Sequence, residues 1–97
     1  MIVSFGDRAT EDLYHNRSTS RVRRFPPEIA GVALVKLDML DAAGAVRDLF
    51  APPGNRLEAL RGDFAGFHSI RVNQRWRIVF RWEGNNAYDV QLTDYHK

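Results

Sequence analysis

The sequence predicts an α+β fold in which two N-terminal helices pack on a mostly antiparallel sheet of four to five strands. Two patterns support this class: apolar residues recur at helical spacing in the first half of the chain and alternate with polar residues in the second half. The joints between the alternating segments are short enough for hairpins, which favours an antiparallel sheet. With 97 residues, the chain has room for one hydrophobic core but not for two, so we expect residues 1–97 to form a single domain.

The first half combines a short strand with two helices. Residues 2–5 are a strand candidate, and Asp7 can cap the helix that follows by accepting a backbone N–H of its first turn. Pro27 suits the first turn of the second helix, and Gly44 stands where a terminating glycine belongs. The apolar stripe of this helix consists of Ile29, Ala33, Leu37 and Leu40. We expect that stripe to pack into the core.

Between the predicted helices lies a basic segment, residues 16–25. It contains Arg17, Arg21, Arg23 and Arg24 and is closed by two prolines. One interpretation is a solvated loop. The other is a surface that contacts a phosphate backbone or a protein partner, and the pattern leaves both open.

The second half contains strand candidates at residues 56–60, 67–72, 75–82 and 87–93. The third of these is the most regular. Its even positions carry Trp76, Ile78, Phe80 and Trp82, and its odd positions include Arg75, Arg77 and Arg81. This alternation predicts a strand with an apolar face in the core and a positive face in solvent.

The last strand is expected to alternate in the same way. One face should carry Tyr88, Val90 and Leu92, and the other Asp89, Gln91 and Thr93. The two final strands should therefore form a hairpin with a shared apolar face.

Composition narrows the functional class. The net charge is +2 and the pI about 9.4, with an excess of arginine that is compatible with a nucleic-acid partner. The absence of cysteine excludes disulfides and the commonest structural zinc sites, and neither His15 nor His68 has a partner at a metal-ligand spacing. The longest apolar run, residues 29–35, is too short to span a membrane, and no secretory signal is evident. We therefore expect a cytoplasmic protein without cofactor, metal or membrane partner.

Residues that can carry chemistry follow the last predicted strand. Asp94, Tyr95 and His96 can each hold or move a proton, and the neighbouring strand carries arginines. Cleavage of RNA by its own 2′-hydroxyl needs a base, an acid and positive charge on the phosphorane, and these residue types supply them. Glu58 is a further proton carrier on an earlier strand. The alternative is a frayed chain end without a role.

Five short motifs follow one another through the second half of the chain. They are Arg-Leu-Glu-Ala-Leu-Arg-Gly-Asp at 56–63, Phe-His-Ser-Ile-Arg-Val-Asn at 67–73, Trp-Arg-Ile at 76–78, Ala-Tyr-Asp-Val at 87–90 and Asp-Tyr-His at 94–96. This ordered set resembles the HigB toxins of type II toxin–antitoxin systems, of the plasmid maintenance killer family within the RelE/ParE superfamily. Residues 1–5 also look like the opening strand of that family. The resemblance therefore covers nearly the whole chain and implies a RelE-like fold.

The resemblance also implies an activity and partners. It implies a toxin that acts as a ribosome-dependent mRNA endonuclease, or mRNA interferase, and so inhibits translation. The message would be cut in the decoding site of the 30S subunit by attack of its 2′-hydroxyl, without a metal. A HigA-like antitoxin with a helix-turn-helix domain would neutralise the toxin, and operator DNA would be bound only through the toxin–antitoxin complex.

Carried over residue by residue, the catalytic set of the family falls on Arg77, Asp94, Tyr95 and His96. Glu58 stands where some members have a catalytic histidine, although a glutamate occurs there in one branch of the family. A carboxylate is not a cationic donor near neutral pH, so its role would differ from that of the histidine. The expected RNA-binding residues are Arg61, which replaces a lysine of many members, with Arg71 and Arg75.

Two alternatives belong to other functional classes. The first is a ParE-like gyrase poison on the same fold, without nuclease activity, which would not need the Asp-Tyr-His sequence at 94–96. The second is an inactive member that only binds RNA or the antitoxin, and Glu58 in place of the histidine is the argument for it.

Overall fold

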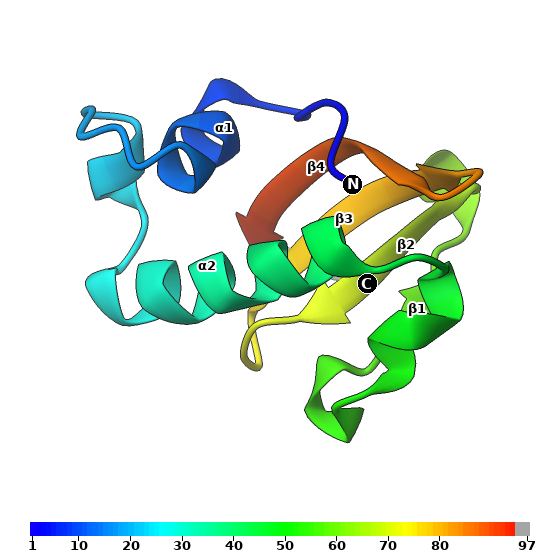
Figure 1. Cartoon of the computed structure of the whole chain (residues 1–97). Helices are drawn as coiled ribbons and strands as arrows, with labels where there is room; N and C mark the ends of the chain where they lie inside the picture. Colours follow the sequence, from blue (N-terminus) through cyan, green and yellow to red (C-terminus); the bar gives the residue numbers. More distant parts are fainter. Residues whose placement is uncertain (95–97) are drawn as a thin grey trace.

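The helices and strands follow the order that the sequence predicts. The structure is a computed structural model that describes residues 1–94. Its helices are α1 (Arg8–Tyr14) and α2 (Pro27–Ala42), and its strands are β1 (Glu58–Ala59), β2 (Phe67–Arg71), β3 (Trp76–Glu83) and β4 (Asn86–Asp94). The strands form an antiparallel sheet in the order β1-β2-β3-β4, with α2 across one face and α1 beside β4 (Figure 1). This arrangement confirms the predicted α+β class.

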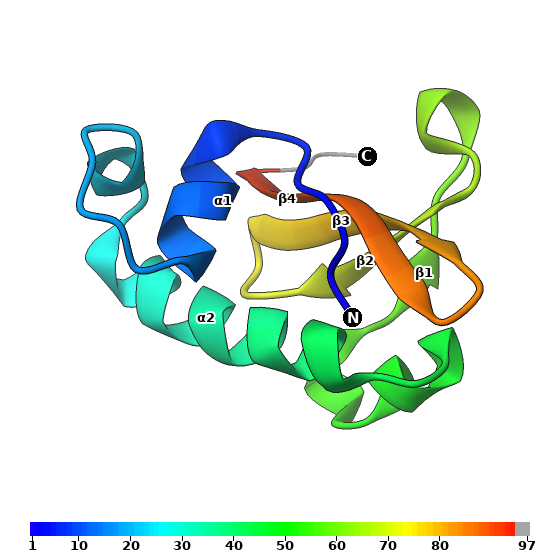
Figure 2. The ribbon, with the colours of Figure 1, turned by 45° about the horizontal axis from the view of Figure 1, so that its top comes forward.

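The N-terminal segment extends the sheet beyond β4. Ile2 pairs in parallel with Ala87, and Phe5 pairs with Val90, through backbone hydrogen bonds of 2.8 to 3.1 Å. Figure 2 shows this segment running beside β4. The strand predicted at residues 2–5 is therefore present as isolated bridges rather than as a continuous ladder.

Local signals set the helix boundaries. The carboxylate of Asp7 accepts a hydrogen bond from the N–H of Thr10 at 2.8 Å, which confirms the predicted cap of α1. Pro27 is the first residue of α2, as predicted. At the other end the cap residue Ala43 is extended, and Gly44 after it does not have a positive φ. Gly44 thus occupies the predicted position just after the cap of α2, without the left-handed backbone that a glycine there often adopts.

The hydrophobic core lies between α2 and the sheet. Fully buried residues are Ala33, Leu37 and Leu40 of α2, and Ile70, Ile78, Phe80 and Val90 of the strands. Each large apolar side chain stabilises the fold by roughly 1.5–3 kcal/mol on complete burial. Trp76 and Trp82 are half-buried and pack against this core from the two ends of β3. The even positions of β3 thus face the core, as predicted.

The opposite face of β3 carries the predicted odd positions but is not exposed throughout. Val79 lies between Arg77 and Arg81 on that face and is only 1% exposed. Long arginine side chains cover apolar neighbours with their aliphatic stems while their charged ends reach water. The positive face therefore has an apolar centre.

A bulge in β4 overturns the predicted position of Tyr88. The pairing with β3 slips by one residue between Val79 and Arg81, and Asp89 has a φ of 54°. Tyr88 is consequently opposite Arg81, away from the core, and Ala87 occupies the core beside Val90 instead. The predicted alternation holds from Val90 to Thr93 and fails at Tyr88, because a bulge reverses the faces on either side of it.

The first predicted strand is shorter than expected. β1 covers Glu58–Ala59 rather than residues 56–60, because Arg56 has a φ of 46°, in the left-handed region where a strand cannot continue. The other strands begin and end within one residue of the predicted boundaries.

Candidate functional site

A row of polar side chains crosses the face of the sheet that α2 leaves uncovered, here called the open face. Residues directly opposite each other in an antiparallel ladder point to the same face. Arg77 on β3 is opposite both Arg71 on β2 and Thr93 on β4. The next row on this face consists of Glu58, Ser69, Val79 and Gln91. The ladder thus brings residues that are far apart in the sequence onto one surface.

Arg77 is half-buried and anchored to the turn between β2 and β3. Its guanidinium donates hydrogen bonds to the backbone carbonyls of Asn73 and Trp76, the second at 3.1 Å. The turn is itself fixed, because the side-chain oxygen of Asn73 accepts hydrogen bonds from the N–H groups of Arg75 and Trp76, each at 2.8 Å. Within residues 1–94, no ion pair joins Arg77 to a carboxylate. Neutral carbonyls therefore position this side chain and leave its charge available.

The charges around Arg77 are mostly of its own sign. Burial lowers the pKa of Arg77, the positive charges of Arg71 and Arg56 lower it further, and Glu58 acts in the opposite direction. A guanidinium keeps its proton in spite of such shifts. The open face therefore holds a surplus of positive charge around a half-buried arginine, which is a favourable surrounding for a bound anion.

Glu58 adds a carboxylate beside these cations. It opens β1 and is half-buried opposite Ser69, which is only 2% exposed. Its negative charge acts on Arg77, so the two groups share one local field. A carboxylate next to an anion-binding cation is suitably placed to accept a proton from a bound phosphodiester substrate.

Arg75 and Asp94 form an ion pair at one end of the sheet. Arg75 Nη2 lies 2.6 Å from Asp94 Oδ2, and the Arg75 side chain is 69% exposed. Asp94 is opposite Trp76 and therefore lies on the face of the core rather than on the open face. The structure thus pairs these two predicted residues with each other at the end of the sheet, outside the row of Arg77.

The other predicted site residues are Arg61, Tyr95 and His96. Arg61 is exposed beyond the end of β1, directly before the short 3-10 turn Gly62–Phe64. The structure therefore places Arg61 at the edge of the sheet. Tyr95 and His96 lie outside the described residues and directly follow Asp94.

Arg81, the third arginine of β3, has different surroundings. Its guanidinium forms ion pairs with Glu83 and with Asp89, the latter at 3.3 Å, and lies 4.8 Å from the ring centre of Tyr88. The hydrogen bond to Glu83 contributes most to raising the pKa of Arg81, and the bond to Asp89 raises it further. The guanidinium of Arg81 is thus paired with carboxylates of the same sheet.

Sequence reasoning missed Arg56 and Thr93 as members of this surface. Arg56 was predicted as the first residue of a strand and not as a site residue. It instead follows the 3-10 turn Pro53–Asn55 with a left-handed backbone, which the sequence did not indicate. Thr93 could have been found, because its expected face and the hairpin register together place it opposite Arg77.

The histidines of the described region have structural surroundings. His68 stacks on Phe80 with 6.0 Å between ring centres, and burial lowers its pKa. His15 contacts the rings of Phe5 and Tyr14 edge-on. Within residues 1–94, no three His, Cys, Asp or Glu side chains are arranged to hold a metal ion. The same residues include no helix long and apolar enough to cross a membrane.

Comparison with solved structures defines the class of fold. A chain of the YoeB–YefM complex from Staphylococcus aureus superposes with a TM-score of 0.62 at 18% identity, covering 100% of this chain and 97% of that chain. The YoeB/ParE toxin from Agrobacterium tumefaciens superposes with a TM-score of 0.55 at 19% identity, covering 98% of each chain. The fold is therefore that of the RelE-like toxins.

Comparison of sequences identifies the family within this class. Residues 3–96 match the family described as the RelE-like toxin of the type II toxin–antitoxin system HigB. Toxin HigB-1 of Vibrio cholerae serotype O1 is 41% identical over 97 residues, which cover 100% of this chain and 99% of that protein. Endoribonuclease HigB of Proteus vulgaris is 32% identical over 100 residues, which cover 99% of this chain and 100% of that protein. The chain belongs to the HigB-like toxin family, as the resemblance implied.

Proposed function

We propose that this toxin is an mRNA endonuclease that acts on the ribosome and stops translation. The observation that carries the proposal is the half-buried Arg77, which backbone carbonyls hold among like charges and beside the carboxylate of Glu58. Fixed guanidinium groups bind phosphate oxygens through charge-assisted hydrogen bonds. The name of the Proteus vulgaris relative, an endoribonuclease, supports the same chemistry.

The proposed reaction is cleavage by the 2′-hydroxyl of the message itself. A base removes the hydroxyl proton, the 2′-oxygen attacks phosphorus, and the 5′-oxygen leaves with a proton from an acid. The products are a 2′,3′-cyclic phosphate and a 5′-hydroxyl. Negative charge increases on the non-bridging oxygens during the attack, and Arg77 and Arg71 stabilise it from the open face without a metal.

Proton transfer is assigned to Glu58 on the sheet and to residues that follow the last residue of β4. Glu58 is the proposed base, because its carboxylate shares the field of Arg77. Tyr95 and His96 are the proposed source of the proton for the 5′-oxygen, since they continue the chain from the end of β4. Asp94, which forms an ion pair with Arg75, is proposed to position the two residues that follow it. Arg61 at the edge of the sheet is a proposed further contact with the RNA backbone.

The proposed partners follow from the family. Membership in a type II toxin–antitoxin family supports a protein antitoxin, which we propose to be HigA-like with a helix-turn-helix domain. Operator DNA is then contacted through that complex. The proposed site of action is the 30S decoding site in the cytoplasm, where a translated message presents single-stranded RNA.

The test is to induce this chain alone in a bacterial host and to map the 5′ ends of messenger RNA across coding regions. We expect new ends in translated messages, and we expect a block of translation initiation to remove them. Arg77→Gln should abolish the cuts, whereas Arg47→Gln, an exposed arginine on the 3-10 turn Val46–Phe50, should retain them. Thermal melts of both purified variants establish that they are folded.

Two results would overturn the proposal. Growth arrest with intact messages and a DNA-damage response would indicate a gyrase poison. Cuts that persist when initiation is blocked would indicate a nuclease that does not need the ribosome.

A further inference from the structure

The basic segment between the helices concentrates positive charge in a small part of the chain. Residues 17–24, here called the arginine segment, carry four arginines and no acidic residue, whereas the whole chain has a net charge of only +2. The remainder of the chain is therefore net negative. The RelE-like site described above does not use this segment, so its charge needs a separate explanation.

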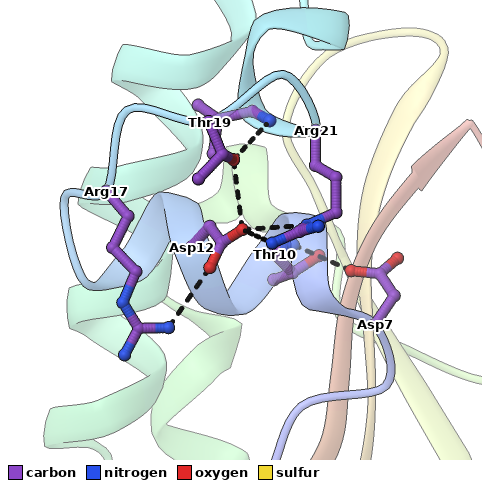
Figure 3. A network of polar contacts seen from close by, with 7 residues as sticks. Asp7, Thr10, Asp12, Arg17, Thr19 and Arg21 are labelled. Carbon is purple, nitrogen blue, oxygen red and sulfur yellow. Dashed lines mark hydrogen bonds and ion pairs between the residues drawn. The ribbon is translucent and has the colours of Figure 1, made fainter.

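A buried carboxylate on α1 holds the arginine segment in place (Figure 3). Asp12, whose side chain is 4% exposed, accepts from Arg17 Nη1 at 3.2 Å and from Arg21 Nε and Nη2 at 3.0 Å. Thr19 Oγ1 donates to the same carboxylate at 3.1 Å and accepts from the N–H of Val22 at 3.3 Å. These bonds fix the conformation of the segment before any ligand arrives.

The carboxylate anchors the segment without neutralising it. Two guanidinium groups share the single charge of Asp12, and the side chains of Arg17 and Arg21 remain 53% and 41% exposed. Within residues 1–94, Arg23 and Arg24 form no ion pair, and both are exposed. Each guanidinium carries five N–H donors, so donors on the segment face solvent. A loop that is already ordered loses less conformational entropy when it binds a ligand, so more of its interaction energy contributes to affinity.

The arginine segment lies at the same end of the sheet as Arg77. Phe25, which closes the segment, packs edge-on against Trp76 with 5.8 Å between ring centres. Trp76 directly precedes Arg77 and is opposite Asp94 at the end of β4. In both Figure 1 and Figure 2 the loop after α1 lies on the side toward which the β4 arrow points. The arginine segment therefore adjoins the core side of the sheet at the same end at which Arg77 lies on the open face.

We propose that the arginine segment is a second phosphate-binding surface, which binds backbone phosphates of the RNA at a distance from the bond that is cleaved. This inference rests on the proposed function, because it assigns the continuation of the same RNA ligand. Guanidinium groups that are pre-positioned and lie at the same end of the sheet as Arg77 suit a repeating polyanion. An acidic protein surface, such as that of an antitoxin, is the competing ligand, and the experiment separates the two.

The test measures the salt dependence of RNA binding. The probe is a fluorescent 2′-O-methyl RNA oligonucleotide, which stays intact because it lacks the attacking hydroxyl. Arg23→Gln, Arg24→Gln and the double variant are compared with Arg47→Gln, which removes the same charge from an exposed site on another turn. Each lost phosphate contact should reduce the slope of log K against log salt by about 0.7 for a single strand. The Arg47→Gln slope should match that of the wild type.

The outcomes separate this inference from the proposed function. An unchanged slope in the double variant would overturn the inference, whether or not the wild type cuts messages. Weaker antitoxin binding with an unchanged RNA slope would assign the segment to a protein contact and overturn it as well. A reduced slope supports it. The mapping of message ends tests cleavage independently, because it depends on Arg77 rather than on Arg23 and Arg24.

Discussion

Arg77 and Arg81 lie on the same face of β3, yet their surroundings shift their pKa values in opposite directions. Burial and the charge of Arg71 lower the pKa of Arg77. Hydrogen bonds to Glu83 and Asp89 raise that of Arg81. The same residue type on the same strand is thus held near like charge in one place and paired with carboxylates in the other.

This difference is the reason for proposing Arg77, and not Arg81, as a phosphate-binding residue. The charge of an arginine that is paired with carboxylates, such as Arg81, is neutralised by ion pairs within the fold. An arginine held by neutral carbonyls among other cations, such as Arg77, keeps its charge for a ligand. Asp12 shows an intermediate case, in which two arginines share one carboxylate.

The largest expected effect comes from Arg77→Gln. Loss of a fixed cation that stabilises the phosphorane should lower the single-turnover rate of message cleavage on ribosomes by about 10²–10³-fold. Arg81→Gln, on the same face, should leave the rate nearly unchanged. Similar losses in the two variants would mean that net charge, rather than the position of Arg77, controls cleavage.

The next effect is expected from Glu58→Gln. The amide has nearly the shape of the carboxylate but cannot accept the 2′-hydroxyl proton, so the cleavage rate should fall by about 10²-fold, the lower end of the range for acid–base catalysis. Glu83→Gln removes an exposed carboxylate of the same sheet and serves as the control. A Glu58→Gln enzyme with the wild-type rate would exclude Glu58 as the base.

A smaller effect, on stability, is expected from Asp12→Asn. Burial raises the pKa of Asp12, but hydrogen bonds from Arg17, Arg21 and Thr19 together bring it below the ordinary value of 3.8. A carboxyl whose pKa is lowered by folding stabilises the native state above pH 3.8, and this stabilisation is lost as the pH falls from there toward the folded-state pKa.

The measurement for Asp12→Asn is urea unfolding as a function of pH. The wild type should lose more free energy of unfolding than the variant as the pH falls below 3.8. Parallel curves for the two proteins would show that the ion pairs of Asp12 contribute nothing to stability.

The smallest effect is expected from Asp89→Asn. Asparagine tolerates the left-handed backbone that the bulge requires, so the fold should be retained. The change removes one carboxylate partner of Arg81 and should strengthen RNA binding slightly, as measured with the intact oligonucleotide. Weaker binding would show that Arg81 needs Asp89 to be positioned for RNA.

The sequence predicted several residues of the candidate site but not all of them. The resemblance and the alternation of β3 singled out Arg77, Arg71 and Glu58, which the sheet brings onto one surface. Arg75 and Asp94 were also predicted as site residues, and in the structure they form an ion pair with each other. Arg56 was missed because it was predicted as a strand residue, whereas its left-handed backbone after a turn and its effect on Arg77 depend on the fold.

The sequence by itself determined the elements whose signals are local. Asp7 caps α1, Pro27 begins α2, and the alternation of β3 decides which residues enter the core, because each of these depends on neighbours within a turn or on a strand period of two.

Only the tertiary structure decided which charges are neutralised. The bulge at Asp89 turns Tyr88 toward Arg81, and the loop after α1 folds back so that Arg17 and Arg21 meet Asp12. These contacts depend on the register between strands and on packing between segments. Which guanidinium groups are paired therefore depends on the carboxylates that the fold brings within reach, and this cannot be predicted from their positions in the chain.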